Sequence, residues 1–156
     1  MSPALAQRVG RLAERFRDIA ATRMQGVALC HPLLEVAAVG FEPVDQGRAA
    51  VGVLITPWFM NLVRLPLATD DVQLPLGASR THALGHERFD FIGAHEDGIG
   101  PFEACSLFSP MHDFTDQAAA IATAEAVLSL LRPAPAPAAE APARRRFLLG
   151  RSGAAA

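Results

Sequence analysis

The residues best suited to covalent chemistry in this sequence are its two cysteines, Cys30 and Cys105. A cysteine nucleophile reacts as the thiolate beside a base, and the natural pairing here would be Cys105 with His112 or His86. Cys105, however, falls in a predicted strand over 102–108, where acidic residues nearby are expected to raise its pKa. We therefore interpret Cys105 as structural and keep a small Cys/His-dependent or metal-binding enzyme centred on it as the alternative.

Metal binding would draw on the histidines, of which the chain has five: His31, His82, His86, His95 and His112. His82 and His86 are four residues apart and share a face in either a helix or a strand. Their spacing matches no known ligand pattern, and the cysteines form no C-x-x-C pair. We expect surface or structural histidines, reduced thiols, no metal and no cofactor.

Other common enzyme signatures are missing. The sequence has no lysine, no nucleophile elbow of the G-x-S-x-G type and no phosphate-binding G-x-x-x-x-G-K-[ST] loop. The net charge of −2 argues against non-specific binding of nucleic acid. No apolar run is long enough to cross a bilayer and no export signal precedes the first helix, which predicts a cytoplasmic protein without membrane insertion.

Charge is divided unevenly along the chain. Residues 70–116 contain nine acids against Arg80 and Arg88, whereas four arginines and no acid follow Ala143. The simplest interpretation is a solvated acidic surface and a solubilising tail. Carboxylates that could instead pair with arginines, in bidentate fashion, are Glu96, Asp97 and Glu103.

The elements that position these residues are predicted from apolar spacing. An amphipathic helix should begin after Ser2 and Pro3, carry an apolar stripe from Leu5 to Ile19, and end near Gly26. A second helix should begin near 113–115 and end at about Leu131, before Pro133. Between them lie β-type runs at 33–41, 49–56, 61–65, 80–93 and 102–108, with a hairpin loop at 45–47 and a surface loop at 66–79.

This order predicts an α+β domain over residues 1–132, in which an antiparallel-rich, meandering sheet lies between the two helices. Residues 133–143, PAPAPAAEAPA, are predicted to be an extended linker that could reach on the order of 30 Å. An arginine-rich, basic-apolar tail follows at 144–156.

Two prolines mark a candidate binding surface. Pro57 and Pro110 each follow a strand-like run and stop ladder pairing where the chain turns. If both strand ends lie at one edge, the neighbouring residues form an apolar patch of a kind that anchors peptides: Trp58, Phe59, Met60, Phe108 and Met111. The alternative is that they are ordinary core residues.

Four segments, taken in order, resemble one known family. They are ITPW (55–58), QLPLG (73–77), CSLFSP (105–110) and the tail RRRFLLG (144–150). Together they are similar to the HybE/HupJ-type NiFe-hydrogenase assembly chaperones. The resemblance implies a non-catalytic, cytoplasmic accessory protein that binds a hydrogenase small or large subunit precursor before export. A structural subunit retained in the finished hydrogenase is a further alternative.

The tail also has the order of a twin-arginine export signal, in which two arginines and a variable residue precede Phe and Leu. Arg144, Arg145 and Phe147 occupy the corresponding positions. The hypothesis is that the tail imitates the client's signal peptide and folds back on the acidic 70–116 stretch until a precursor displaces it. The alternatives are a tail that packs as structure or that contacts the client directly.

Overall fold

The computed structural model describes residues 2–68 and 73–132. Its first element, α1, is the helix Pro3–Ala21, with Pro3 in the first turn and the Ser2 hydroxyl accepting from the backbone N–H of Leu5 at 3.2 Å. The predicted apolar stripe is buried. The helix ends five residues before the predicted Gly26, because the Thr22 hydroxyl donates to the Asp18 carbonyl at 2.6 Å and the backbone leaves helical geometry there.

Six antiparallel strands form one sheet in the order β1-β2-β3-β6-β5-β4. Their bounds are β1 Ala37–Val44, β2 Ala49–Ile55, β3 Met60–Pro66, β4 Ser79–Leu84, β5 Glu87–Glu96 and β6 Gly100–Phe108. The predicted hairpin loop is confirmed: Asp45–Gly47, labelled η1, joins β1 to β2, and both Asp45 and Gln46 have positive φ there. The single run predicted over 80–93 is wrong, because it is a hairpin of β4 and β5 that turns at Gly85, whose φ is +63°.

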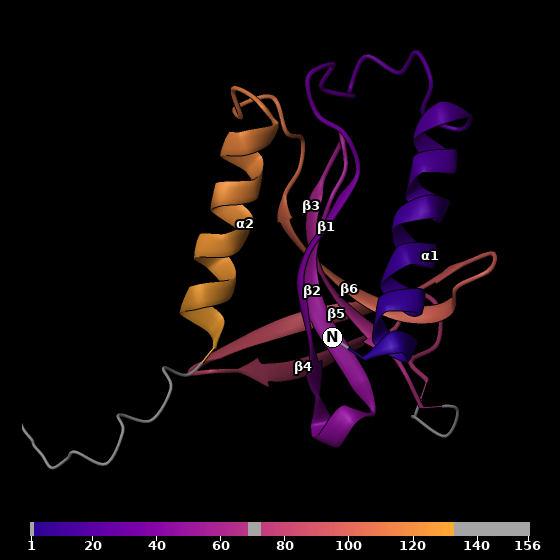
Figure 1. The fold of residues 1–156 in the computed structure, drawn as a ribbon, viewed down its shortest axis with the longest axis vertical. Coiled ribbons are helices and arrows are strands. Elements are labelled where there is room, and N and C mark those ends of the chain that lie inside the picture. The colour runs from indigo at the N-terminus through magenta and orange to yellow at the C-terminus, as the bar shows by residue number, and fades with distance from the viewer. Residues whose placement is uncertain (1, 69–72, 133–156) are drawn as a thin grey trace, which may run out of the picture.

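The two helices cover opposite faces of the sheet (Figure 1). The residues of α1 pack with Phe41, Leu54 and Val63 in one apolar cluster, and those of α2 pack with Val53, Leu62 and Phe91 in another. This alternation follows from the two-residue period of side chains along a strand. Successive residues of a strand therefore pack into different apolar clusters, so residues that are adjacent in the predicted patch can lie on opposite faces of the sheet.

The second helix, α2, is Gln117–Leu131 and begins two to four residues later than predicted. Asp116 is extended, and its carboxylate accepts from the backbone N–H of Ala119 at 2.9 Å, which fixes the start. The fold is α+β, as expected. The predicted linker and tail lie outside the described residues. Within the part of the chain that the structure describes, no helix is long and apolar enough to span a membrane.

Candidate partner-binding surface

The turn between β2 and β3 is built around Thr56, which is fully buried. Its hydroxyl accepts from the backbone N–H groups of Trp58 at 3.2 Å and Phe59 at 3.0 Å, and its own N–H donates to the Phe59 carbonyl at 2.8 Å. These hydrogen bonds close the turn after Pro57 and fix both aromatic residues in one orientation. The hydrogen-bonded turn of the ITPW segment therefore holds Trp58 and Phe59 in defined positions.

Trp58 and Phe59 line a groove of about 260 Å³ between α1 and the sheet. The Phe59 ring meets those of Phe16 and Trp58 edge to face, with centroids 5.8 and 5.7 Å apart. The rest of the lining is mostly apolar and comes from α1, the loop after it and the sheet: Ile19, Met24, Leu54, Val63, Ala94, Phe102 and Ala104, with Arg23, Asn61 and Glu96. Aromatic anchors in such a groove are suited to binding apolar side chains of a peptide.

One wall of the groove is charged. The Glu96 carboxylate accepts from Arg15 at 3.1 Å and pairs with Arg23 at 3.7 Å, and its side chain is 17% exposed. Arg15 also lines a neighbouring hollow of about 380 Å³, together with Asp97, Arg11, Glu14 and Asp18. The Arg15–Glu96 pair thus joins an apolar groove to a hollow of mixed charge, and two of the three predicted carboxylates lie here.

Asn61 adds an unusual polar group to the groove. Its Oδ1 atom is buried and has no hydrogen-bond partner among the described residues. Native proteins rarely leave a buried acceptor unpaired, because its desolvation costs about 1 to 3 kcal/mol. The sequence did not single out Asn61 as a binding residue, because whether its side-chain oxygen finds a partner depends on the packing around it.

The five apolar residues predicted as one patch are divided by the sheet. The strand ends do meet, since Met60 pairs with Phe108, but Met60 points to the face opposite Trp58 and Phe59. Met60 and Met111 are both fully buried in the core beneath α2, so neither forms a surface in this structure. Phe108 is 40% exposed and rests edge to face on Phe114, with ring centroids 5.2 Å apart.

Glu103 lies inside the protein, with a side chain 3% exposed. Its carboxylate binds Arg80 at 2.6 Å, His82 at 2.7 Å and Arg64 at 3.4 Å. Burial by itself would raise the pKa of this carboxyl, but the hydrogen bonds from Arg80 and His82 outweigh burial and lower the pKa below its usual value. Glu103 was predicted to pair with the arginines of the tail or of the client, and in this structure three side chains of the domain already bind it.

His31 was grouped with the other histidines in the sequence, yet it joins three loops. Its Nδ1 accepts from the Leu33 N–H at 3.1 Å, so the proton on Nε2 is donated to the Phe114 carbonyl at 2.7 Å. The His31 backbone N–H donates to the Pro57 carbonyl at 2.8 Å. The loop after α1 is thereby fastened to the turn that carries Trp58.

The chemistry considered for Cys105 finds little support in its surroundings. Burial, and then the negative charge of Asp90, raise the pKa of this thiol, the direction expected from the sequence. The described residues contain no group of three or more His, Cys, Asp or Glu side chains that could hold a metal ion. His112, the proposed base, stacks on His31 with ring centroids 6.3 Å apart.

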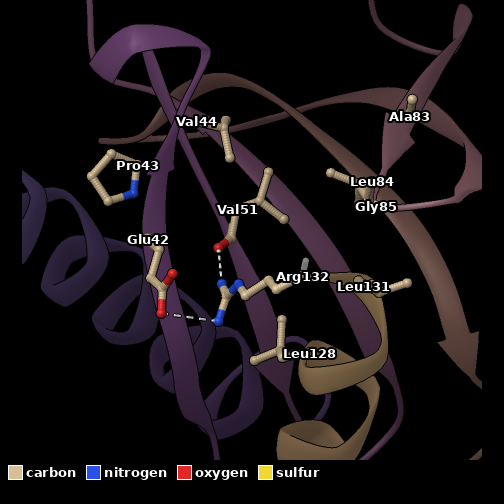
Figure 2. A pocket seen from close by; sticks show the side chains of 10 residues that line it. All are labelled: Glu42, Pro43, Val44, Val51, Ala83, Leu84, Gly85, Leu128, Leu131 and Arg132. Atoms are coloured by element: carbon tan, nitrogen blue, oxygen red, sulfur yellow. Dashed lines mark hydrogen bonds and ion pairs between the residues drawn. The ribbon is translucent and has the colours of Figure 1, made fainter. Parts of the chain in front are cut away.

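A further cavity, of about 410 Å³, lies at the C-terminal end of α2 (Figure 2). It is bounded by β1 and β2 on one side, the tip of the β4–β5 hairpin on another and the last turn of α2. Arg132 closes one side, donating to Glu42 at 3.2 Å and to the carbonyls of Val51 at 3.1 Å and Gly40 at 2.6 Å. No sequence pattern predicted this cavity, because its walls come from four separate elements.

The fold places two helices on opposite faces of a six-stranded antiparallel sheet, with an aromatic groove on the α1 face. Residues 7–150 match the family model described as [NiFe]-hydrogenase assembly, chaperone, HybE, and the chain belongs to this family. The predicted tail residues Arg144, Arg145 and Phe147 lie within the matched range but outside the described residues.

Individual relatives agree with this assignment. The chain is 45% identical to Protein HoxT of Cupriavidus necator over 159 residues, covering 92% of this chain and 89% of that protein. It is 40% identical to the hydrogenase expression/formation protein HupJ of Bradyrhizobium diazoefficiens over 134 residues, covering 86% and 76%. The solution structure of HybE from Escherichia coli has the same fold, with a TM-score of 0.64 at 23% identity, covering 96% of this chain and 93% of that one.

Proposed function

We propose that this protein is a non-catalytic, cytoplasmic chaperone that binds a NiFe-hydrogenase subunit precursor in the groove between α1 and the sheet. The family assignment supports hydrogenase assembly as the process, and the groove supports the mode of binding. The observation that carries the proposal is the combination of three features in one groove: a fixed aromatic pair, a buried acceptor without a partner and a carboxylate at the rim.

Each feature matches a part of an extended peptide. Trp58 and Phe59 offer apolar contact area to its side chains, and the Asn61 Oδ1 offers an acceptor to a backbone N–H. Glu96 offers a carboxylate to an arginine, which would replace Arg23 at 3.7 Å more easily than Arg15 at 3.1 Å. A twin-arginine signal peptide carries both requirements, since apolar residues closely follow its arginines, and we propose it as the bound segment.

The surface around the groove favours a client larger than the signal peptide alone. Val27, Leu29 and Leu33 are exposed in the loop that His31 fastens to the Trp58 turn. Exposed apolar side chains beside a groove commonly belong to interaction surfaces. The folded part of the precursor would contact this loop while its signal peptide occupies the groove.

The test is capture of precursor and mature subunit by the immobilised full-length protein. Precursor should be recovered in preference, and Trp58→Ala should weaken its capture by about 2 kcal/mol, or roughly 30-fold in Kd. Glu96→Gln should weaken capture mainly at low salt, because it removes one charge pair. Leu130→Ala, at an 81% exposed position on α2 outside the groove, is the control that should change nothing.

Two outcomes would overturn the proposal. Equal capture of precursor and signal-cleaved subunit would mean that the immature state is not recognised. A large fall in melting temperature for Trp58→Ala, with undiminished capture by the folded fraction, would make Trp58 a core residue instead of a binding residue. A precursor lacking its signal peptide separates binding of the signal from binding of the subunit body.

A further inference from the structure

We propose that the cavity at the C-terminal end of α2 is the docking site for the chain's own segment Phe147-Leu148-Leu149, with Arg144 to Arg146 at its rim. The docking itself does not depend on the proposed function. It assigns an occupant to a cavity on the α2 face of the sheet, opposite the face that carries the aromatic groove.

The cavity is suited to apolar side chains. Most of the described residues that line it are apolar: Pro43, Val44, Val51, Ala83, Leu84, Leu128 and Leu131. The two charged residues in the lining, Glu42 and Arg132, bind each other, and Arg132 also takes the Val51 carbonyl. Because these polar groups already have partners, an apolar side chain can enter without stranding them. A volume of about 410 Å³ is within the range of sites that hold small ligands or a few side chains.

The path of the chain points to the same occupant. Arg132, the last described residue, forms part of the cavity wall, so whatever follows it starts at the cavity rim. The Pro/Ala-rich stretch 133–143 can span on the order of 30 Å when extended and needs much less to turn back. A segment tethered this closely has an effective concentration in the millimolar range, so weak apolar contacts suffice to hold it.

Charge and fold place the arginines of the segment here and not on the acidic 70–116 stretch. Glu42 binds Arg132 through its Oε2 atom, but it is a 62% exposed carboxylate and can accept from a second arginine. The C-terminal end of α2 carries the negative pole of the helix. Glu103, in contrast, is buried and held by Arg64, Arg80 and His82, while Glu96 lies on the α1 face. Docking at the rim also avoids a path around the edge of the sheet.

The family match gives an independent reason to regard the segment as functional. The family model matches residues 7–150 and so includes Arg144 to Leu149, whereas residues 151–156 lie beyond the match. One consequence rests on the proposed function. If the aromatic groove binds twin-arginine signals, docking in the cavity keeps the protein's own signal-like segment out of that groove.

Trypsin reports on docking directly, because its cleavage sites in the tail are the arginines in question. In full-length protein, cleavage after 144–146 should be about tenfold faster for Ala83→Glu than for wild type, since the new side chain fills the cavity from an exposed position. Ser79→Glu is the matched control, on the same strand, exposed and outside the lining, and should cleave at the wild-type rate. Equal rates for all three proteins would overturn the proposal.

A second measurement leaves the described residues unchanged. The full-length double variant Phe147→Ser/Leu148→Ser should leave the cavity vacant and bind a synthetic RRRFLLG peptide. NMR shift changes should then fall on the amides of Leu84, Leu128 and Leu131. Changes at Trp58 and Ala104 instead would assign the segment to the groove and contradict docking in the cavity. Tail protection that falls on dilution would mean binding to a second copy and would contradict docking within one chain.

Discussion

Cys105 is the residue on which any enzymatic alternative depends, and its surroundings make it a weak nucleophile. Burial and the Asp90 carboxylate raise the pKa of the thiol, so the reactive thiolate is scarce near neutral pH. In a Cys30→Ser background, alkylation of Cys105 by iodoacetamide at pH 7.5 should be slower than that of a free cysteine. Asp90→Asn should accelerate it, because the pKa falls when the negative charge is removed.

A substitution of Cys105 distinguishes a thiol enzyme from a precursor-binding chaperone. Cys105→Ser should leave capture of the precursor within about twofold of wild type, as expected for a substitution outside the binding groove. Two results together would favour the thiol enzyme: fast alkylation of Cys105 at neutral pH in the Cys30→Ser background, and loss of precursor capture in Cys105→Ser.

Sequence reasoning at the level of single residues rests on the residue type and its neighbours in the chain. Trp58 and Phe59 follow a strand-ending proline, and the structure places both in one groove with Glu96. It was less informative for Asn61, whose unpaired Oδ1 atom is a feature of packing, and for His31 and Arg132, whose significance comes from the distant backbone groups that they contact. Those contacts join positions far apart in the chain, and no local pattern encodes them.

Among the elements, α2 packs on the sheet through its buried apolar residues, and specific hydrogen bonds fix its two ends. Asp116 caps its start, and Arg132 fastens its end to the irregular pairing between Val39 and Glu42 of β1. Gly40 allows this contact, since a Cβ there would lie 2.6 Å from the Leu128 Cδ1 atom and φ is +63°. The last turn of the helix is therefore positioned by backbone carbonyls of another element.

Arg132→Ala should loosen this end of α2. Two hydrogen bonds to the Gly40 and Val51 carbonyls and one to Glu42 are lost, which should lower the free energy of unfolding by about 2 kcal/mol. Amide hydrogen exchange in the last turn of α2 should quicken in the same variant. Glu42→Ala, which removes only the exposed ion pair, should cost less than about 1 kcal/mol. Equal losses for both variants would contradict the role of the two carbonyls.

The elements themselves were predicted in the right order, because helix and strand periods differ and the prolines and glycines punctuate them. Their ends were less accurate. The helix starts and stops depend on hydroxyl and carboxylate contacts at Thr22 and Asp116, which compete with alternatives two to five residues away. The β4–β5 hairpin was missed because its turn is short and Gly85 is the main local signal.

At the scale of the whole molecule, alternation along the strands assigns different work to the two faces. Trp58 and Phe59 belong to the α1 face, whereas Met60 and Met111 stabilise the α2 face. A one-dimensional reading sees these residues as one cluster, since the face of a residue is settled only when the register is known. The protein thus presents a groove on one face and a cavity on the other, separated by the sheet.

The cluster around Glu103 joins strands that are not neighbours in the sheet. Arg64 comes from β3, while Arg80 and His82 come from β4, two strands away from β6. Removing one partner from a buried ionic group leaves the others without compensation, so Glu103→Gln should lower the free energy of unfolding by about 3 to 5 kcal/mol at pH 7. Asp45→Asn is the control, because its 58% exposed carboxylate binds the same Arg64 at 2.8 Å and should contribute less than about 1 kcal/mol.

The pH dependence gives this prediction its sign. Because the pKa of Glu103 is lower in the folded protein than in the unfolded chain, its charged form stabilises the fold fully above the unfolded value of about 4.3. That contribution is lost as the pH falls through the lower folded pKa. Urea unfolding at pH 7, 5 and 3.5 should therefore show a large difference between wild type and Glu103→Gln at the two higher values and a smaller one at the lowest. A difference that stays constant over this range would mean that the carboxylate acts through packing and not through its charge.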